Sequence, residues 1–293
     1  MCYTLTLVAP VASGALSAAL IARVREEVGG GLPEVLAPDE AVDIAVADAP
    51  AMAVVRAALD GASIDAIVTP RGARRKALLI ADMDSTIVSG ETLDELADCA
   101  GLKDQIAAIT ARAMNGELDF KAALRERVAM LQGLAVDALE QTWRRVRLTP
   151  GARELVATMR AHGAYTVLVS GGFGFFADRV AALCGFDLQR SNVLLDDGSA
   201  LTGRVGEPIL DRDSKLATLC AVANGRGLPM SATLAVGDGA NDLDMIRAAG
   251  LGVAFRAKPI VAAEAPVRVD HADLRALLFA QGYHGREFVS QWR

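Results

Sequence analysis

The stretch Ala77-Leu-Leu-Ile-Ala81, followed at once by Asp82-Met-Asp84-Ser-Thr86, decides the fold of this chain. A continuous apolar run of this length indicates a β-strand that is buried on both faces, as in a parallel sheet covered by helices. In open α/β folds, ligands bind beyond the carboxyl ends of the strands. The stretch therefore predicts an α/β core and also the edge of the sheet at which its site lies.

Further strand-like runs follow along the chain, at residues 165–169, 232–236 and 251–255. The first two end in glycine-rich turns and are followed by helical patterns, which is typical of a doubly wound parallel sheet. Residues 90–147 show helical spacing and no strand signal, so they predict a helical insert. Asp196-Asp-Gly198 lies between apolar runs within residues 193–207 and predicts a hairpin.

The first 70 residues form a separate pattern of strand, helix, two strands, helix and strand. This order predicts a small α+β domain of the ferredoxin-like, or ACT-like, kind. The basic segment Pro70-Arg-Gly-Ala-Arg-Arg-Lys76 is the best boundary, and we expect it to be a solvated linker. The expected organisation is an N-terminal domain over 1–70 and an α/β core over 76–293, with a helical cap inserted at about 88–155.

Composition excludes several classes of protein. The chain has 293 residues and a formal net charge of −6, with no long run of either sign, which disfavours nucleic-acid binding. It has no apolar stretch of roughly 20 residues, which a membrane span needs, and its start lacks a secretory signal, so we expect a cytoplasmic protein. The four cysteines and three histidines are scattered, which disfavours zinc and predicts reduced thiols.

Three polar clusters follow predicted strands, and a parallel sheet would bring them into one crevice. They contribute Asp82, Asp84, Asp238 and Asp242. Four carboxylates cannot share a small space without a cation, and Mg²⁺ is the natural partner of hard oxygen ligands. Ser170, Thr86 and glycine N–H groups would supply hydrogen-bond donors to an anion. Together these groups indicate phosphoryl transfer.

At this point the sequence resembles a known family. Asp82-Met-Asp-Ser-Thr86, Ser170, Lys215 and Gly237-Asp-Gly-Ala-Asn-Asp242 match, in order, the four motifs of the haloacid dehalogenase-like phosphatases. The resemblance is closer still to the phosphoserine phosphatase branch of that superfamily, and it covers roughly residues 76–285. The stretches that carry it are DSTIVSGETLDELA at 84–97, ARAMNGELDFKAALRERV at 111–128, SGGF at 170–173 and VGDGANDLDMI at 236–246.

The resemblance implies a role for each motif residue. Asp82 would be the nucleophile and a metal ligand, and Asp84 the general acid and then base, with its main-chain carbonyl at the metal. Lys215, Ser170 and the Gly171 N–H would hold the phosphate. Asp238 would complete the Mg²⁺ site, and Asp242 would ligate directly or act through water.

The resemblance also implies a substrate, O-phosphoserine, and a place in serine biosynthesis. Glu91 would contact the ammonium group and Arg127 the carboxylate, Met114 and Phe120 would form an apolar wall, and Asn241 would help to position the substrate. The cap would close over the site, with hinges near Gly90 and Pro150-Gly151. A homodimer is left open.

Other functions are compatible with parts of the same sequence. The same chemistry on another small phosphomonoester, phosphate transfer to homoserine, and a non-catalytic sensor of amino acids or phosphate remain alternatives. A cysteine phosphatase is rejected. Cys184 and Cys220 each precede an arginine at the spacing that such an enzyme needs. The loop after Cys184 would turn Asp187 toward the phosphate, and Leu183 stands where a histidine is expected; Cys220 lies in a helical pattern that cannot form a phosphate cradle.

Overall fold

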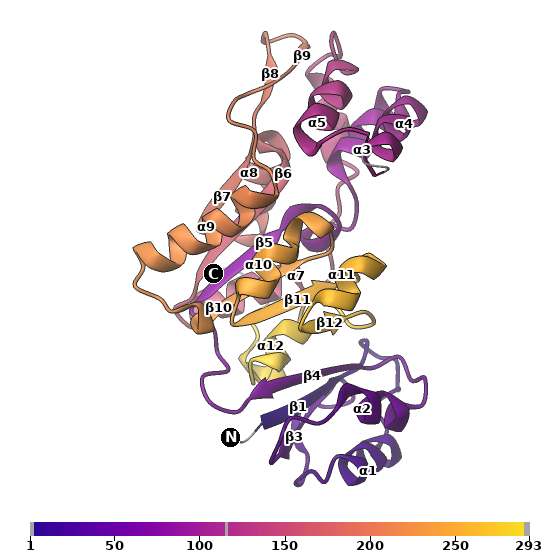
Figure 1. Ribbon diagram of the computed structural model, residues 1–293, viewed down its shortest axis with the longest axis vertical. Helices are drawn as coiled ribbons and strands as arrows, with labels where there is room; N and C mark the ends of the chain where they lie inside the picture. Colours follow the sequence, from indigo (N-terminus) through magenta and orange to yellow (C-terminus); the bar gives the residue numbers. More distant parts are fainter. Residues whose placement is uncertain (1–2, 115–116, 290–293) are drawn as a thin grey trace.

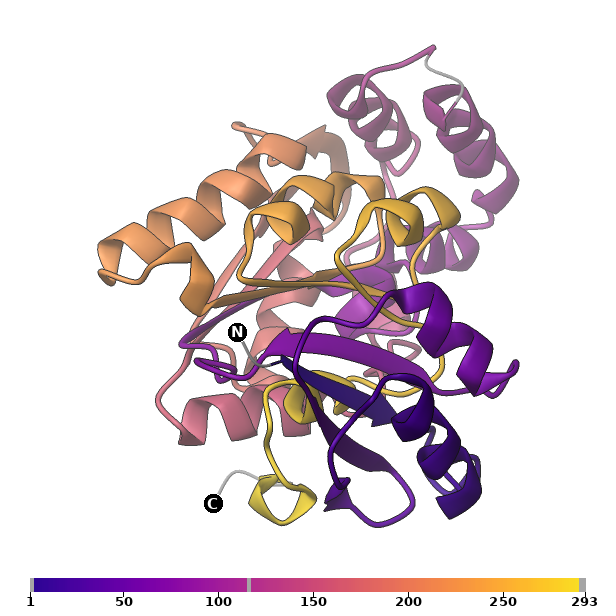
Figure 2. The same cartoon turned by 60° about the horizontal axis from the view of Figure 1, so that its bottom comes forward.

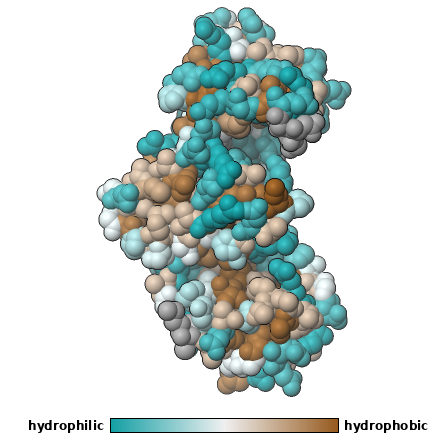
Figure 3. Space-filling view, in the orientation of Figure 1, coloured by the Kyte–Doolittle hydropathy of each residue, from teal (hydrophilic) through white to brown (hydrophobic). Residues whose placement is uncertain are grey.

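The chain is arranged in three tiers, with a helical cap above a central α/β core and an N-terminal layer below it (Figure 1). The computed structural model describes residues 3–114 and 117–289. On the face drawn in Figure 3, the cap surface is mainly hydrophilic. Among the described residues, no helix has both the length and the apolar character that crossing a membrane requires.

The core is one sheet of six parallel strands in the order β12-β11-β10-β5-β6-β7. Every residue of β5, β10 and β11 is buried, as the apolar runs predicted. The doubly wound parallel sheet is therefore confirmed. The strands are β5 (Leu78–Asp82), β6 (Tyr165–Phe173), β7 (Leu188–Asn192), β10 (Thr233–Gly237), β11 (Leu251–Phe255) and β12 (Val267–Val269).

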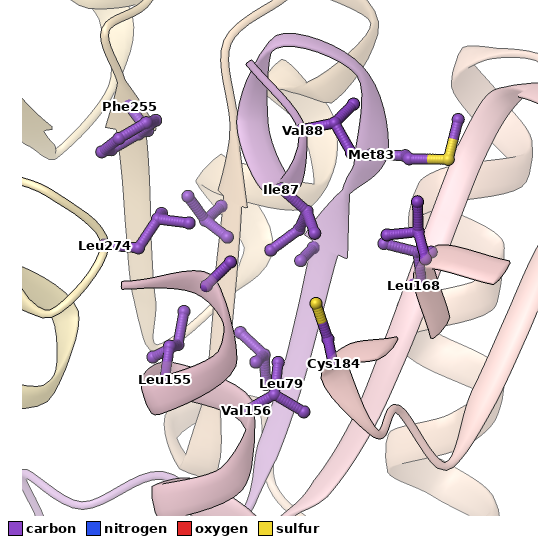
Figure 4. Packing of buried hydrophobic residues seen from close by; sticks show 14 of the residues in the cluster. Leu79, Met83, Ile87, Val88, Leu155, Val156, Leu168, Cys184, Phe255 and Leu274 are labelled. Carbon is purple, nitrogen blue, oxygen red and sulfur yellow. The ribbon is translucent and has the colours of Figure 1, made fainter. Parts of the chain in front are cut away.

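Helices cover both faces of this sheet, because alternate residues of each strand point to opposite sides. Leu79 packs in one cluster with residues of α7 (Ala152–Ala161), α8 (Gly174–Cys184) and α12 (Ala276–Ala280). Its neighbours Leu78 and Ile80 pack with α9 (Arg212–Gly225) and α10 (Leu243–Ala248) on the other face. Figure 4 shows the first cluster, where Leu79 lies among Leu155, Val156 and Leu168.

The N-terminal layer is a four-stranded antiparallel sheet in the order β2-β3-β1-β4. With two helices on one face, this is the ferredoxin-like arrangement that the element order predicted. On its other face, Val8 and Ile67 share a buried cluster with Leu277 and Phe279 of the C-terminal segment, which Figure 2 shows beside the sheet. The elements are β1 (Tyr3–Val8), α1 (Ala18–Glu27), β2 (Glu34–Ala37), β3 (Ala41–Val46), α2 (Met52–Leu59) and β4 (Asp65–Pro70).

The segment between the two sheets is largely exposed, as a solvated linker would be, but Arg74 is not. The Arg74 guanidinium lies 2.5 Å from Asp43 Oδ2 and also donates to the Thr6 hydroxyl and to the carbonyl oxygens of Phe279 and Ala280. Its side chain is only 12% exposed. The expectation was wrong for Arg74, because a planar fork of donors can satisfy a buried carboxylate and two carbonyls at once.

The cap consists of four helices between two short legs of chain that pair with each other at Val88 and Leu148. A hairpin from the core, β8 (Leu194–Asp196) and β9 (Leu201–Val205), lies against it. Gly133 N–H donates to the Leu201 carbonyl (2.9 Å), and Leu201 N–H donates to that of Leu134 (2.8 Å). The hairpin was predicted, but its contact with the cap was not. The cap helices are α3 (Thr92–Cys99), α4 (Lys103–Met114), α5 (Phe120–Ala129) and α6 (Asp137–Trp143).

Of the cysteines that the structure describes, Cys99 and Cys220 are partly exposed and Cys184 is buried. Burial raises the pKa of Cys184 to about 12. A thiol with such a pKa carries almost no thiolate at neutral pH and is a poor nucleophile. This environment supports the rejection of a cysteine phosphatase.

Candidate active site

Three acids meet at the carboxyl edge of the core sheet. Asp82 is the last residue of β5, and Asp238 follows β10 directly. Asp242 lies in a short helical turn (Ala240–Asp242) beyond it. One carboxylate oxygen from each of the three lies within 4.8 Å of the others, and all three residues are buried. The sheet thus brings these acids together as the strand ends predicted.

Lys215 lies between two of these acids. Its Nζ is 2.7 Å from Asp82 Oδ1 and 2.6 Å from Asp242 Oδ1, and its side chain is 3% exposed. The Asp211 carboxylate accepts a hydrogen bond from Ser214 N–H and caps α9, which places Lys215 in the first turn of that helix. Although burial works against the charged amine, Asp242 and Asp82 raise the pKa of Lys215 above its ordinary value.

Two ammonium groups, the buried Lys215 and the more distant and exposed Lys258, do not balance three carboxylates. Burial and the neighbouring charge of Asp242 raise the pKa of Asp82 well above its ordinary value, although Lys215 opposes the shift. The same two causes raise the pKa of Asp238 to about 6. A buried site with excess negative charge requires a cation.

The pattern of hydrogen bonds shows where a metal ion would fit. Asp82 Oδ1 accepts from Lys215 and from Met83 N–H (2.8 Å), and both Asp242 oxygens accept, from Lys215 and from Gly239 N–H (3.0 Å). Among the described residues, no hydrogen bond is made to the Asp238 carboxylate or to Asp82 Oδ2, although Lys258 Nζ lies 4.0 Å from Asp238 Oδ2. These hard oxygens form a donor set for a divalent metal ion.

Asp84 lies apart from this group. Its Oδ1 accepts from Thr92 N–H (2.8 Å) at the start of α3, and its Oδ2 accepts from the Ser170 hydroxyl (3.3 Å). Burial, followed by the charge of Glu91, raises the pKa of Asp84 to about 7. A Cβ on Gly172 would lie 2.9 Å from Asp84 Oδ2, so this approach of loop to carboxyl group requires glycine. Such a carboxyl group can hold a proton at neutral pH and release it.

The anion cradle differs in part from the prediction. Gly171 lines the cleft, whereas Ser170 is buried behind it and accepts a hydrogen bond from Gly172 N–H (2.8 Å). Thr86 does not line the cleft, and its buried hydroxyl has no partner among the described residues. The expectation that Thr86 binds an anion therefore has no support in this arrangement.

A cleft of about 600 Å³ lies between the sheet edge and the cap. From the cap, Glu91 reaches it while accepting a hydrogen bond from the Ser85 hydroxyl (2.7 Å). Arg127 lines it half-buried, and Phe120 lies over Gly171. Met114 ends α4, but its side chain is outside the described residues. The residues that line the cleft include Asp82, Asp84, Glu91, Leu93, Leu118, Phe120, Leu124, Arg127, Gly171, Gly172, Asp238, Asn241, Lys258 and Ile260.

Lys258 and Ile260 are among the residues that line the cleft and that the sequence did not predict. Lys258 Nζ lies 4.0 Å from Asp238 Oδ2, and its N–H donates to the Asp238 carbonyl (3.1 Å). Ile260, which is 60% exposed, follows on α11 (Pro259–Glu264). Both come after β11, so the rule that sites form beyond strand ends applies to them too. Neither residue was predicted, because β11 is followed by no acid and no glycine-rich turn.

Comparison with known proteins now defines the class. Residues 79–247, more than half of the chain, match the model of the haloacid dehalogenase-like hydrolases. The chain belongs to this family, as its motifs predicted.

The similarity is most detailed with phosphoserine phosphatases. That of Streptococcus thermophilus is 46% identical over 199 residues, which are 68% of this chain and 93% of that protein. That of Streptomyces coelicolor is 43% identical over 221 residues, and this chain spans about half its length (54%). A solved phosphoserine phosphatase with an analogue of the phospho-aspartyl intermediate is 38% identical, with a TM-score of 0.65, over 70% of this chain and 98% of that one. Within its family, the chain groups with the phosphoserine phosphatases.

Proposed function

We propose that this chain is a Mg²⁺-dependent phosphoserine phosphatase that converts O-phospho-L-serine and water into L-serine and phosphate. The observation that carries the proposal is the Asp82–Lys215 pair. Asp82 is a buried carboxylate that lines the same cleft as Asp84, with one oxygen held by an ammonium and the other without a hydrogen-bond partner among the residues that the structure describes. The similarity to phosphoserine phosphatases supports the choice of substrate.

The chemistry divides into two displacements. One carboxylate oxygen of Asp82 attacks phosphorus, the bond from phosphorus to the serine oxygen breaks, and Asp84 gives its proton to that oxygen. Asp84, now ionised, takes a proton from water, whose oxygen attacks the phosphorus of the aspartyl-phosphate. The acyl oxygen of Asp82 leaves as carboxylate, and phosphate is released. Lys215 stabilises the carboxylate before attack and after release.

Mg²⁺ is the ion that this set of oxygens suits best. Asp82 and Asp238 would hold it, together with the main-chain carbonyl of Asp84. Asp242 would act through water, because its two oxygens already accept hydrogen bonds from Lys215 and Gly239. When bound, the ion neutralises negative charge on the phosphoryl oxygens.

Substrate selectivity follows from two opposite charges on the cap. Glu91 would receive the ammonium group and Arg127 the carboxylate, the latter as a bidentate pair. The Arg127 side chain is available for this, because its only hydrogen bond within the described part of the chain runs from Nε to the Ala123 carbonyl on its own helix (3.4 Å). Phe120 covers one side, and Asn241 lines the other part of the cleft.

We also propose the organisation into an ACT-like domain over 1–70, a core over 76–293 and a cap over about 88–155. The separate sheets and the paired legs of the cap support it. Whether the N-terminal domain senses serine or joins two copies of the chain is a question for ligand titration and for measurement of mass in solution.

The test compares Arg127→Ala with Arg125→Ala, a change of the same kind two residues away on α5. Arg125 points elsewhere, to Glu207 (2.7 Å). We expect Arg127→Ala to lower kcat/KM for O-phosphoserine by about 100-fold, because a buried charge pair with the substrate is lost. Hydrolysis of p-nitrophenyl phosphate, which has no carboxylate, should change by less than about threefold. Arg125→Ala should leave both substrates unchanged.

Equal losses on both substrates would remove Arg127 from the substrate carboxylate. A better substrate than O-phosphoserine among small phosphomonoesters, or transfer of phosphate to homoserine, would favour the related activities. Failure of beryllium fluoride to bind Asp82 would favour a sensor without catalysis.

A further inference from the structure

We propose that Glu40 and Arg275 are positioning residues that couple the N-terminal sheet to the cap. They hold residues 150 and 151, where the chain returns from the cap to the core. The inference rests on the proposed function only through its kinetic readout.

The two legs of the cap are joined to each other. Thr149 N–H donates to the Ile87 carbonyl (2.9 Å), and Ser89 N–H donates to that of Arg147 (3.0 Å). Ile87 ends the turn Met83–Ile87, which carries Asp84. A displacement of the returning leg is therefore passed directly to the turn that carries Asp84.

The returning leg ends against a C-terminal segment, residues 273–275. Leu274 N–H donates to the Pro150 carbonyl (3.1 Å). Gly151 has a φ of 82°, and a Cβ there would lie 2.7 Å from Arg275 N and 2.9 Å from Asp273 Oδ1. Glycine is required here on both grounds, and the contact fixes residues 150 and 151 onto residues 273–275.

Arg275 links this contact to the N-terminal sheet. Its N–H and its Nε donate to Asp273 Oδ1 (2.9 and 3.1 Å), and its Nη2 lies 3.2 Å from Glu40 Oε1. Glu40 lies in the turn between β2 and β3. The three side chains are 12 to 21% exposed, so solvent screens these charges only in part. A continuous set of polar contacts thus runs from the N-terminal domain to the cap hinge.

A second ion pair provides the matched control. Arg75, between the two sheets, lies 2.6 Å from Glu287 Oε1 in the C-terminal turn. The Glu287 carboxylate accepts hydrogen bonds from Arg75 and from His284 N–H and lies 3.8 Å from His162 Nε2, and among the described residues it has no hydrogen bond with residues 147–151. Glu287→Gln removes the same charge as Glu40→Gln and leaves the hinge contacts in place.

The experiment is hydrogen exchange of the full-length chain, followed by mass spectrometry of peptides that cover residues 86–90 and 147–151. We expect Glu40→Gln to raise exchange in both peptides by about threefold or more, because the hinge opens more often. Glu287→Gln should change neither. Glu40→Asp, which keeps the charge, should restore part of the protection.

Two further readouts separate positioning from general loss of stability. In Glu40→Gln, the KM for O-phosphoserine should rise about threefold to tenfold while kcat stays within about twofold. The reason is that a smaller fraction of molecules has the cap in the conformation that binds substrate. In an Arg275→Lys background, Glu40→Gln should add less than it does alone, because both act through one contact.

Unchanged exchange in Glu40→Gln, or the same increase in Glu287→Gln, would overturn the proposal. The exchange measurement uses no substrate, so it stands even if phosphoserine proves not to be hydrolysed.

Discussion

Two regions of this molecule bury carboxylates, and they do so in opposite ways. At the interface between the two sheets, Asp43 is held by Arg74 and the Thr6 hydroxyl, and Asp65 accepts hydrogen bonds from the N–H groups of residues 270–272. At the sheet edge, Lys215 contacts Asp82 and Asp242, whereas the Asp238 carboxylate accepts no hydrogen bond from the described residues and has only Lys258 Nζ at 4.0 Å. Burial of an acid therefore does not mark a functional site. A functional site is marked instead by buried negative charge that no cation balances and by carboxylate oxygens that accept no hydrogen bond.

The largest expected effect tests this contrast at Asp82. Asp82→Asn should lower kcat for O-phosphoserine by roughly 10⁴-fold, because the nucleophile is lost. Its melting temperature without divalent metal should stay equal or rise, because one of the crowded charges is removed. Steady-state kinetics and thermal unfolding measure the two effects. Retained turnover would mean that another group attacks phosphorus.

The opposite outcome is expected at the interface. Arg74→Met leaves Asp43 buried without its cation and should lower the free energy of unfolding by about 3 to 5 kcal/mol. The kcat of the folded fraction should stay within about twofold, since Arg74 does not line the cleft. Urea denaturation and kinetics in the same buffer test both statements. A stable variant would show that Arg74 is not the main partner of Asp43.

Metal binding should stabilise one region and not the other. Free Mg²⁺ at about 100 times its Kd should raise the free energy of unfolding by about 2.7 kcal/mol. Asp238→Asn should remove most of this gain, whereas Asp65→Asn should keep it despite a lower starting stability. Activity should disappear in excess chelator and return with Mg²⁺. Hydrolysis that persists in chelator would refute the metal site.

The smallest expected effect concerns pH. Burial and Glu91 raise the pKa of Asp84 to about 7, so the group loses its proton as the pH rises through that value. The protonated form is needed when serine leaves, and kcat for O-phosphoserine should therefore fall about tenfold for each unit well above pH 7. The rate with p-nitrophenyl phosphate, which has a good leaving group, should fall less. Parallel pH profiles for the two substrates would argue against Asp84 as the acid.

The sequence predicted those parts of the structure whose signals are local. The buried strands, their terminal acids and the order of N-terminal elements all follow from short patterns, and the structure has them. It did not predict β7 and β12, which are edge strands with mixed burial rather than apolar runs. It also did not predict the Arg74 contacts, because Asp43 and the Phe279 carbonyl lie far from Arg74 in the chain.

The site was predictable to a similar degree. The positions of Asp82, Asp238 and Asp242 follow from strand topology, while the exclusion of Thr86 and the inclusion of Lys258 depend on side-chain directions that spacing does not give. The roles assigned to these residues stay predictions until the variants are measured.

The hairpin against the cap has a consequence for protein engineering. Val136 N–H donates to the Ser199 carbonyl (3.0 Å), in addition to the two bonds that tie residues 133 and 134 to Leu201. The module that would set specificity is thus assembled from two separate stretches of the gene. A chimaera that exchanges residues 88–155 alone would pair a foreign cap with the original hairpin, so a successful transplant must carry residues 193–207 with it.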